Sequence, residues 1–465
     1  MHTEDTIAAI STPLGKSGIG IVRLSGKDSI KIADKIFISP KKKKLAQTPS
    51  QRIIYGHIVN PKGKEVIDEA LVSAMKAPNT YTKEDIVEIN CHGGIVPLRR
   101  VLELVLNAGA RLAGPGEFTQ RAFLNGRLDL AQAEAVLDVI NALTEQSQKT
   151  ALEQLRGGLS KKLKEIREEL LELTAFVEAH IDFPEEDLES LSLKDMKKRA
   201  QRIQRSLRKL VDGSRYGMVL REGVKTAIIG RPNVGKSSLL NALLEHDRAI
   251  VTEIPGTTRD VIEEYLSVNG IPVRIMDTAG IREVKDIAEK EGVRRSIRAM
   301  EDADLVLLIL DGSDALHKTD NELIEKSRSK SRIIVINKAD LPQKINPPSS
   351  PFSKGDFPSI KRGLRGVSPL FEKEGLGSRC REALQREVEI FIRISAKQGT
   401  GLDELKNKIA ETVLQGRVES GANVVTNVRH VHALEKALAS INSFITAVGE
   451  KTSPEFLSVE LRDAL

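Results

Sequence analysis

Residues 230–237 read Gly-Arg-Pro-Asn-Val-Gly-Lys-Ser and lie between the apolar run TAIIG and the helix-like run SSLLNALL. This spacing is that of a phosphate-binding loop between a strand and a helix. Gly230 and Gly235 let the backbone aim its N–H groups at a phosphate, and the start of the helix adds partial positive charge. Lys236 supplies a full charge to the β and γ phosphates, and Ser237 offers its hydroxyl to Mg2+. For this motif alone, a glycine-rich turn that merely caps a helix is the alternative.

Four further segments follow in the order that a guanine-nucleotide site requires. Gly256-Thr-Thr-Arg-Asp contains Thr258, the switch threonine expected to close on Mg2+, and Asp277-Thr-Ala-Gly follows the strand-like run VRIMD. Asn337-Lys-Ala-Asp follows the apolar run RIIVI, and the Asp340 carboxylate can accept two hydrogen bonds from the guanine edge, whereas adenine leaves it desolvated and unpaired. Ser-Ala-Lys after FIRI completes the base pocket.

Together the five segments predict a guanine-nucleotide-hydrolysing switch protein. The predicted nucleotide-binding residues are Asn233, Val234, Gly235, Lys236, Ser237, Ser238, Thr257, Thr258, Asp277, Thr278, Ala279, Gly280, Asn337, Lys338, Asp340, Ser395, Ala396 and Lys397.

These motifs leave the group that orients the attacking water open. Ile281 follows the Asp-Thr-Ala-Gly segment, where Ras-like proteins have a glutamine, and an isoleucine cannot orient water. The candidates downstream are charged, and a carboxylate suits the role best, although any one of them is more often a solvated surface charge: Arg282, Glu283, Lys285 and Glu289. No residue identifies itself as an arginine finger, so we expect a cation or a second subunit to neutralise charge.

The pattern of apolar residues predicts a multidomain fold. From about residue 220, the runs TAIIG, VRIMD, LVLLILD, RIIVIN and FIRIS alternate with helical stretches, which predicts an inserted α/β P-loop GTPase domain with a mostly parallel sheet over 218–416. Helical spacing on either side predicts an α-helical domain in two parts, 126–217 and 417–465. Residues 1–125 mix short strand-like runs with Gly and Pro turns and predict an α+β domain. The segment 343–390 is rich in Pro, Gly, Ser and Lys, and predicts a disordered surface insertion.

Composition limits the remaining possibilities. The 465 residues carry a net charge of +6 and a pI near 9.0, which suits an RNA partner but is spread along the chain. The lysines at 41–44 can contact phosphates, although such a run is more often a solvated loop. The two cysteines, Cys91 and Cys380, form no cluster, which argues against disulfides and structural zinc. No leader or membrane-length apolar run is present, so we expect a cytoplasmic protein without membrane contact.

Longer phrases are more discriminating than the GTPase motifs, namely GIVRLSG, PGEFTQRAFLNGRLDLAQAEA, AHIDFPEED, GRPNVGKSSLLNALL, IPGTTRD and DTAGIRE. With them the chain resembles the MnmE (TrmE) family of tRNA-modification GTPases over nearly its whole length, except 343–390. The resemblance implies a homodimer joined through N-terminal folate-binding domains, with GTP/GDP, tRNA and the flavoprotein MnmG as partners. It also implies that a carboxymethylaminomethyl-type group is installed at carbon 5 of the wobble uridine. A folate, 5,10-methylenetetrahydrofolate or a relative, and FAD on the partner supply the chemistry.

The resemblance also implies roles for single residues. Asn233 corresponds to an asparagine that holds K+, with Ile254 and Thr257 in the loop that completes the ion site, and this ion stands in for the arginine finger. Glu289 corresponds to the glutamate that orients water. In the N-terminal domain, the residues at folate-site positions are Arg23, Glu88 and Arg127, of which Arg127 replaces a more usual lysine. From the residues alone, these three charges are more simply surface or fold-stabilising groups.

One departure and two alternatives remain. The family ends in a Phe-Cys-Ile-Gly-Lys tail, whereas this sequence ends at Leu465, and neither cysteine maps onto the tail. GTP hydrolysis without uridine modification is therefore an alternative to modification with MnmG, and we expect an exposed apolar stripe containing Leu434, Leu438 and Ile441. A ribosome-assembly GTPase is one alternative, but it would carry a KH-type or second GTPase module, and neither is visible. A non-catalytic folate scaffold is the other, and it would have a damaged nucleotide site.

Overall fold

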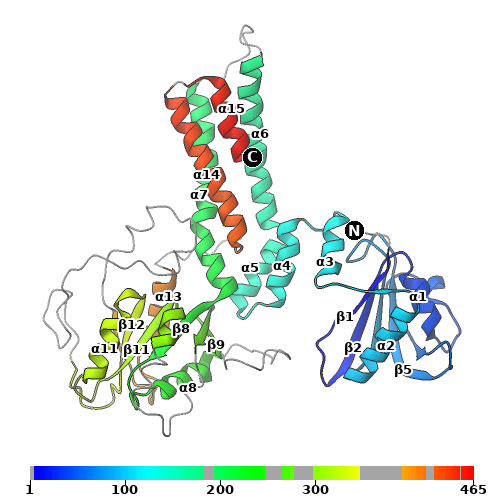
Figure 1. Cartoon of the computed structure of the whole chain (residues 1–465), viewed down its shortest axis with the longest axis horizontal. Helices are drawn as coiled ribbons and strands as arrows, with labels where there is room; N and C mark the ends of the chain where they lie inside the picture. The colour runs from blue at the N-terminus through cyan, green and yellow to red at the C-terminus, as the bar shows by residue number, and fades with distance from the viewer. Residues whose placement is uncertain are drawn as a thin grey trace. The chain divides into compact units, whose positions relative to one another are not determined.

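The computed structural model describes residues 5–182, 193–247, 264–276, 297–345, 390–414, 424–450 and 452–465. The chain divides into two compact units, Met1–Leu137 and Asp138–Leu465 (Figure 1). Within the described part, no helix is long and apolar enough to cross a membrane.

The N-terminal unit is built on a seven-stranded sheet with the strand order β3-β4-β5-β6-β2-β1-β7. All neighbouring strands are antiparallel except β1 and β7. The strands are β1 (Ile7–Ile10), β2 (Ser17–Ser25), β3 (Phe37–Ile38), β4 (Arg52–Val59), β5 (Val66–Met75), β6 (Ile86–Gly93) and β7 (Arg111–Leu112). The helices are α1 (Ser29–Ile36), α2 (Ile95–Asn107) and α3 (Glu117–Leu124), with a short 3-10 turn at Leu45–Gln47. Helix α4 (Leu130–Ile140) spans the boundary between the units.

Alternation along the strands separates the two faces of this sheet. Val22 and Leu24 of β2 are buried in one core with α1 and α2, whereas Arg23 between them points to the other face. On that other face Tyr55 and Leu71 oppose each other across β4 and β5, and they are 45% and 43% exposed. The unit therefore has a helix-covered core and a second face that carries polar and exposed apolar side chains.

The second unit contains a six-stranded sheet with the order β13-β12-β11-β8-β10-β9. The strands are β8 (Val224–Ile229), β9 (Glu264–Val268), β10 (Ile271–Met276), β11 (Leu305–Asp311), β12 (Arg332–Asn337) and β13 (Ile390–Arg393). Five strands are parallel, which confirms the predicted α/β class. The helices of this part are α8 (Lys236–Asp247), α11 (Lys318–Lys326) and α13 (Leu402–Leu414), with a 3-10 turn at Ser327–Ser329.

Strand β11 shows why the apolar runs lack alternation. Its residues 305, 307 and 309 belong to one core with α8 and α13, and residues 306, 308 and 310 belong to a second core with α11. A strand covered on both faces needs apolar side chains at every position. The run LVLLILD meets that need.

The antiparallel edge strand β9 was not predicted. It pairs with β10 around Asn269 and Gly270, whose φ angles are 51° and 80°. Two left-handed residues make the tight turn of a hairpin, and Asn-Gly is its strongest sequence signal. The Asn-Gly dipeptide is the sequence signal from which β9 could have been predicted.

Long helices precede and follow the sheet along the chain. They are α5 (Glu145–Leu155), α6 (Gly158–Asp182), α7 (Leu193–Glu222), α14 (Val428–Gly449) and α15 (Pro454–Ala464). Helix α14 packs on α7 and α15, and α15 packs on α6 (Figure 1). The predicted insertion of the sheet domain between two packed helical segments is thus confirmed.

The expectation of an exposed stripe on α14 was wrong. Leu434 and Ile441 are 7% and 0% exposed, and Leu438 is half-buried, because α7 and α15 cover this helix. Most of the predicted insertion 343–390 lies outside the described residues. At its ends, Ile345 is buried in a sheet core and Ile390 begins β13.

Candidate functional site

The phosphate loop, residues 230–237, connects β8 to α8 at the carboxyl edge of the parallel sheet. Gly230 has a φ of 154°, and an added Cβ would lie 2.5 Å from the Ile309 carbonyl oxygen. Gly235 has a φ of 99°, and an added Cβ would lie 2.2 Å from Nδ2 of Asn337. Both positions therefore need glycine, because a side chain would push the loop away from the strands that hold it.

Lys236 is held inside this loop. Its ammonium group donates to the carbonyl oxygens of Gly230, at 2.7 Å, and Arg231, at 2.8 Å. Burial lowers the pKa of Lys236 to about 8. A partly buried ammonium held by carbonyl groups gains strongly from a nearby anion, so the loop is chemically suited to phosphate. Ser237 is half-buried in the first turn of α8, whereas Asn233 and Ser238 are exposed.

Asn337 joins the phosphate loop to a second loop. It is buried at the end of β12, and its side chain donates to the Val234 carbonyl, at 2.9 Å, and accepts from the Ala396 N–H, at 3.0 Å. Val234 lies in the phosphate loop, and Ala396 follows β13. The amide thus fixes three strand ends at one edge of the sheet, where α/β folds bind ligands.

Asp340 lies at the surface beside the same strand ends. The Ser395 hydroxyl donates to its carboxylate at 2.6 Å. This hydrogen bond lowers the pKa of Asp340, with a smaller contribution from the charges of Lys397 and Lys338. The carboxylate is therefore ionised at neutral pH and can accept hydrogen bonds from a ligand.

Two supporting groups were not predicted. Asp311, at the end of β11, binds the Lys338 ammonium at 2.6 Å and the Ser313 hydroxyl at 2.7 Å. Burial raises the pKa of Asp311, but the hydrogen bonds from Lys338 and Ser313 outweigh it, so the net pKa is lowered. Its position at the carboxyl end of a buried strand was the available signal.

Arg231 is the second unpredicted group. Its guanidinium lies 2.9 Å from the Asp314 carboxylate and 3.3 Å from that of Asp320, which is 2% exposed. Asp320 also accepts from the His317 N–H at the start of α11. The phosphate loop is thus tied to α11 as well as to β12.

Several predicted residues lie outside the described part of the chain. They are Ile254, Thr257, Thr258, Asp277, Thr278, Ala279, Gly280 and Glu289, together with the other water-orienting candidates Arg282, Glu283 and Lys285. Within the described part, no three His, Cys, Asp or Glu side chains cluster closely enough to hold a metal ion.

Two of the three N-terminal candidates, Arg23 and Glu88, occupy the second face of the seven-stranded sheet. Arg23 and Glu88 oppose each other on β2 and β6 and form an ion pair at 2.7 Å. The Arg23 guanidinium also lies 5.8 Å from the centre of the Phe118 ring on α3. Arg127 follows α3, and its guanidinium donates to the backbone carbonyl of Tyr81 at 3.2 Å. The same guanidinium lies 4.7 Å from the centre of the Tyr81 ring.

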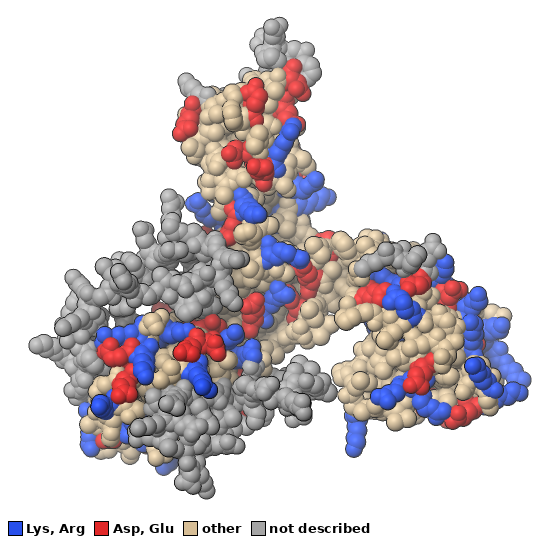
Figure 2. Space-filling view, viewed as in Figure 1, with Lys and Arg blue, Asp and Glu red and all other residues tan. Residues whose placement is uncertain are grey.

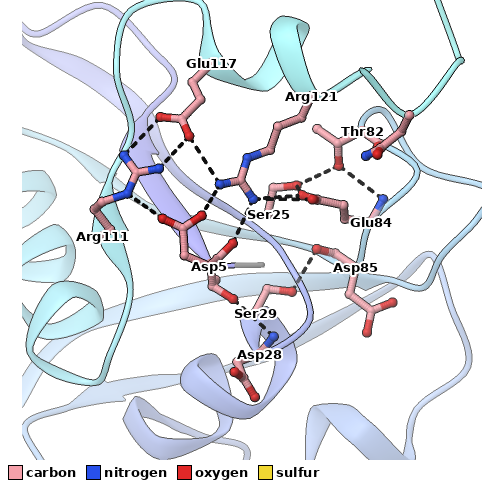
Figure 3. A network of polar contacts seen from close by, with 12 residues as sticks. Asp5, Ser25, Asp28, Ser29, Thr82, Glu84, Asp85, Arg111, Glu117 and Arg121 are labelled. Carbon is pink, nitrogen blue, oxygen red and sulfur yellow. Dashed lines mark hydrogen bonds and ion pairs between the residues drawn. The ribbon is translucent and has the colours of Figure 1, made fainter. Parts of the chain in front are cut away.

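An ion-pair network holds α3 in this position (Figure 3). Arg121 of α3 is 3% exposed and binds the carboxylates of Asp5 at 2.5 Å, Glu117 at 3.2 Å and Glu84 at 3.3 Å. Arg111 completes the network through ion pairs of 2.6 Å with both Asp5 and Glu117. Because Phe118 lies on the same helix, the network also fixes the ring beside Arg23.

Cys91 lies in the core of this unit, where it is 3% exposed. Burial, and to a lesser extent the charge of Asp68, raises the pKa of its thiol to about 11. A protonated, buried thiol is a poor nucleophile at neutral pH. Cys380 lies outside the described residues.

Two family models account for almost the whole sequence. The model described as the MnmE helical domain matches residues 130–465, and that described as the GTP-binding protein TrmE N-terminus matches residues 6–127. The chain belongs to the MnmE family. Curated relatives named tRNA modification GTPase MnmE agree over the full length of the chain. The Alkaliphilus oremlandii protein is 47% identical, and the match covers 100% of this chain and 94% of the length of that protein.

Two further MnmE relatives are similar to the same degree. The Ligilactobacillus salivarius protein is 47% identical over 99% of this chain and 92% of its own, and the Geobacillus thermodenitrificans protein is 46% identical over 100% and 94%. Among solved structures, Era from Aquifex aeolicus bound to GDP and AlF4- is 28% identical and covers 48% of this chain and 65% of its own. Its TM-score of 0.25 is too low to support an argument. The MnmE matches displace the two alternatives, a ribosome-assembly GTPase and a non-catalytic folate scaffold.

Proposed function

We propose that this chain binds GTP at the carboxyl edge of the six-stranded sheet and hydrolyses it as part of tRNA modification. The observation that carries the proposal is the Asn337 amide, which joins the phosphate loop to the loop after β13. A nucleotide whose phosphates lie on the Lys236 loop then has its base between Asn337, Asp340 and Ala396. The ionised Asp340 carboxylate accepts hydrogen bonds from the N1–H and the 2-amino group of guanine, both of which adenine lacks.

The proposed nucleotide site would also hold two metal ions, Mg2+ and K+. Ser237 and Thr258 would hold Mg2+, which neutralises phosphate charge when bound. A hydroxyl in the first turn of α8, next to the partly buried Lys236 ammonium, fits an ion that is shared with phosphate oxygens. Asn233, Ile254 and Thr257 would hold K+, and the exposed Asn233 side chain is free to turn toward the nucleotide. Glu289 orients the attacking water in this proposal.

Turnover assays test the hydrolysis proposal. We expect the full chain to hydrolyse GTP but not ATP, and Lys236→Ala to abolish the activity, because the loop loses its charge on the phosphates. Glu289→Ala should lower kcat by about 100-fold or more while GTP affinity is kept, since the group acts mainly in the transition state. Glu283→Ala is the matched control and should retain activity. Equal hydrolysis of ATP and GTP, or equal rates for the two glutamate variants, would contradict these assignments.

We further propose that the N-terminal unit binds a folate. Two guanidinium groups, Arg23 and Arg127, lie beside aromatic rings and suit a ligand that combines a flat ring with carboxylates. The expected ligand is 5,10-methylenetetrahydrofolate or a related folate. Calorimetry on the full chain with a reduced folate should show binding that Arg23→Ala weakens by about tenfold or more. The absence of heat with a folded protein would refute the folate site.

Assembly and partner are part of the same proposal. We propose a homodimer formed through the N-terminal units, and Ile53, Tyr55 and Leu71 supply apolar surface on one sheet face. The chain then acts with the flavoprotein MnmG, which carries FAD, at carbon 5 of the wobble uridine. Light scattering should give twice the chain mass of 51.1 kDa, and a larger complex after MnmG is added. Ile53→Asp should weaken the dimer. A monomer at all concentrations, or two separate species in the mixture, would contradict this part.

A further inference from the structure

A basic pocket lies on the N-terminal unit, apart from Arg23, Glu88 and the sheet face that carries them. It has a volume of about 560 Å3, and five lysines and two aspartates among its lining residues give it a net charge of +3: Lys27, Ile30, Lys31, Asp34, Lys35, Lys44, Ala46, Lys76 and Asp85. Lys and Arg side chains gather at the α1 end of this unit (Figure 2). We call these residues the lysine pocket.

The two aspartates of the lysine pocket accept hydrogen bonds from backbone N–H groups. Asp34 accepts hydrogen bonds from the N–H groups of Leu45, at 2.6 Å, and Ala46, at 3.3 Å, whereas Asp85 accepts from Ala77 at 2.8 Å. These hydrogen bonds hold the chain around Ala46 and Lys76, which line the pocket. Lys31 pairs with Asp28 at 3.9 Å, a long ion pair between exposed side chains, so its charge remains available to a ligand.

Two of the pocket lysines form hydrogen bonds to backbone carbonyl groups. Lys35 donates to the Ala108 carbonyl at 2.8 Å, and Lys76 donates to the Ala46 carbonyl at 3.2 Å. Lys31 and Lys35 are four residues apart in α1, so they lie on one side of the helix with a rise of about 6 Å between them, and Lys27 lies two residues before the helix begins. The buried side of the helix carries Ile32, Ala33 and Ile36.

The positive charge extends beyond the pocket. Lys44 is both a pocket residue and the last residue of the run 41–44, whose side chains are all exposed. An extended row of cations suits an extended polyanion better than a single phosphate group. Among the described lining residues, none is aromatic, so recognition would use phosphates and not stacked bases.

We propose that the lysine pocket and the adjoining run 41–44 bind the phosphate backbone of an RNA, with the tRNA substrate as the occupant. This inference rests on the proposed role in tRNA modification. It assigns the α1 side of the N-terminal unit to RNA docking, separate from the nucleotide site and from the folate-binding face.

The test measures tRNA binding by the full chain with a labelled tRNA transcript. The test variant replaces Lys31, Lys35 and Lys44 with Gln, and a charge-matched control replaces the exposed helical residues Lys161, Lys164 and Lys198 with Gln. We expect the test variant to bind tRNA about tenfold more weakly or worse, and its salt slope to fall by about 2 to 3 across roughly 50 to 300 mM KCl. The control should bind like the original chain. A variant with Arg at the three pocket positions should restore binding, and GTP turnover should be unchanged in all of them.

Three other results would contradict the pocket assignment or the proposed role in tRNA modification. Unchanged affinity and salt slope in the test variant, or an equal loss in the control, would overturn the pocket assignment. Displacement of tRNA by millimolar pyrophosphate, but not by KCl of the same ionic strength, would indicate a small phosphate ligand and also overturn it. If the original chain binds no tRNA at any salt concentration, the proposed role in tRNA modification fails as well.

Discussion

Asn233 combines two properties at one residue of the phosphate loop. Its φ of 64° is left-handed, which asparagine tolerates better than most residues, and its amide is exposed beside the proposed nucleotide site. The backbone contribution and the side-chain contribution can therefore be separated by substitution.

We predict that replacing Na+ by K+ raises GTP turnover, roughly 10-fold to 100-fold, because the ion supplies charge in the transition state. Asn233→Gly keeps the left-handed backbone but removes the amide oxygen, so it should lose the K+ response. Asn233→Ala should lose the response and also cost about 1 to 2 kcal/mol through backbone strain. Steady-state rates in the two salts and thermal unfolding measure both effects. A K+ response that survives in Asn233→Gly would show that the side chain holds no ion.

Helix α3 depends on a single buried cation. Arg121 pairs with three carboxylates, those of Asp5, Glu84 and Glu117, and Arg121→Ala leaves Glu84 without a cation and Asp5 and Glu117 with Arg111 alone. We predict a loss of about 3 to 5 kcal/mol in the stability of the N-terminal unit. Arg121→Lys should recover part of it, because lysine keeps the charge but not the forked donors. Denaturant unfolding followed by circular dichroism measures the difference, and a change below about 1 kcal/mol would show that the network contributes little.

The same network predicts acid sensitivity. Hydrogen bonds from Arg111 lower the pKa of both Asp5 and Glu117, and smaller contributions come from Arg121 and, for Glu117, from the Gly114 N–H. Their stabilisation is complete above the unfolded pKa values near 4 and is lost as the pH falls through the lower folded values. The stability of the original chain should therefore fall below about pH 4, and that of Arg121→Ala should fall less steeply. Parallel pH profiles for the two proteins would contradict the assignment.

Helix α14 offers a matched pair of phenylalanines with its neighbour α15. Phe444 is 0% exposed and Phe456 is 67% exposed. We predict that Phe444→Ala destabilises the helical part by about 3 to 5 kcal/mol, whereas Phe456→Ala changes its stability by less than about 0.5 kcal/mol. Chemical denaturation of both variants checks this. Similar losses would mean that the packing of α14 against α7 and α15 is not the one described.

At the scale of the whole molecule, sequence alone predicted the α/β class, because the runs ending at Ile229, Asp311 and Asn337 have no alternation and form strands covered on both faces. It also predicted which loops meet, since parallel strands end at one edge. It could not predict that Asp311 binds Lys338 or that Arg231 binds Asp320, because these pairs depend on strand neighbours and a helix start that are distant in sequence. The burial of Leu434 was missed for the same reason, as its partners lie on other helices.

The account as a whole depends on a guanine-reading site at the edge of the sheet, and nucleotide choice tests it most directly. Asp340→Asn exchanges a carboxylate for an amide beside Ser395, and the amide can donate to the carbonyl that xanthine carries in place of the guanine amino group. The measurement is kcat/KM for GTP and for xanthosine triphosphate with the original chain and the variant. We predict that kcat/KM for GTP is lower in the variant by about 100-fold or more, and that the variant has a higher kcat/KM for xanthosine triphosphate than the original chain has. Unchanged kcat/KM for GTP in Asp340→Asn would contradict the central claim.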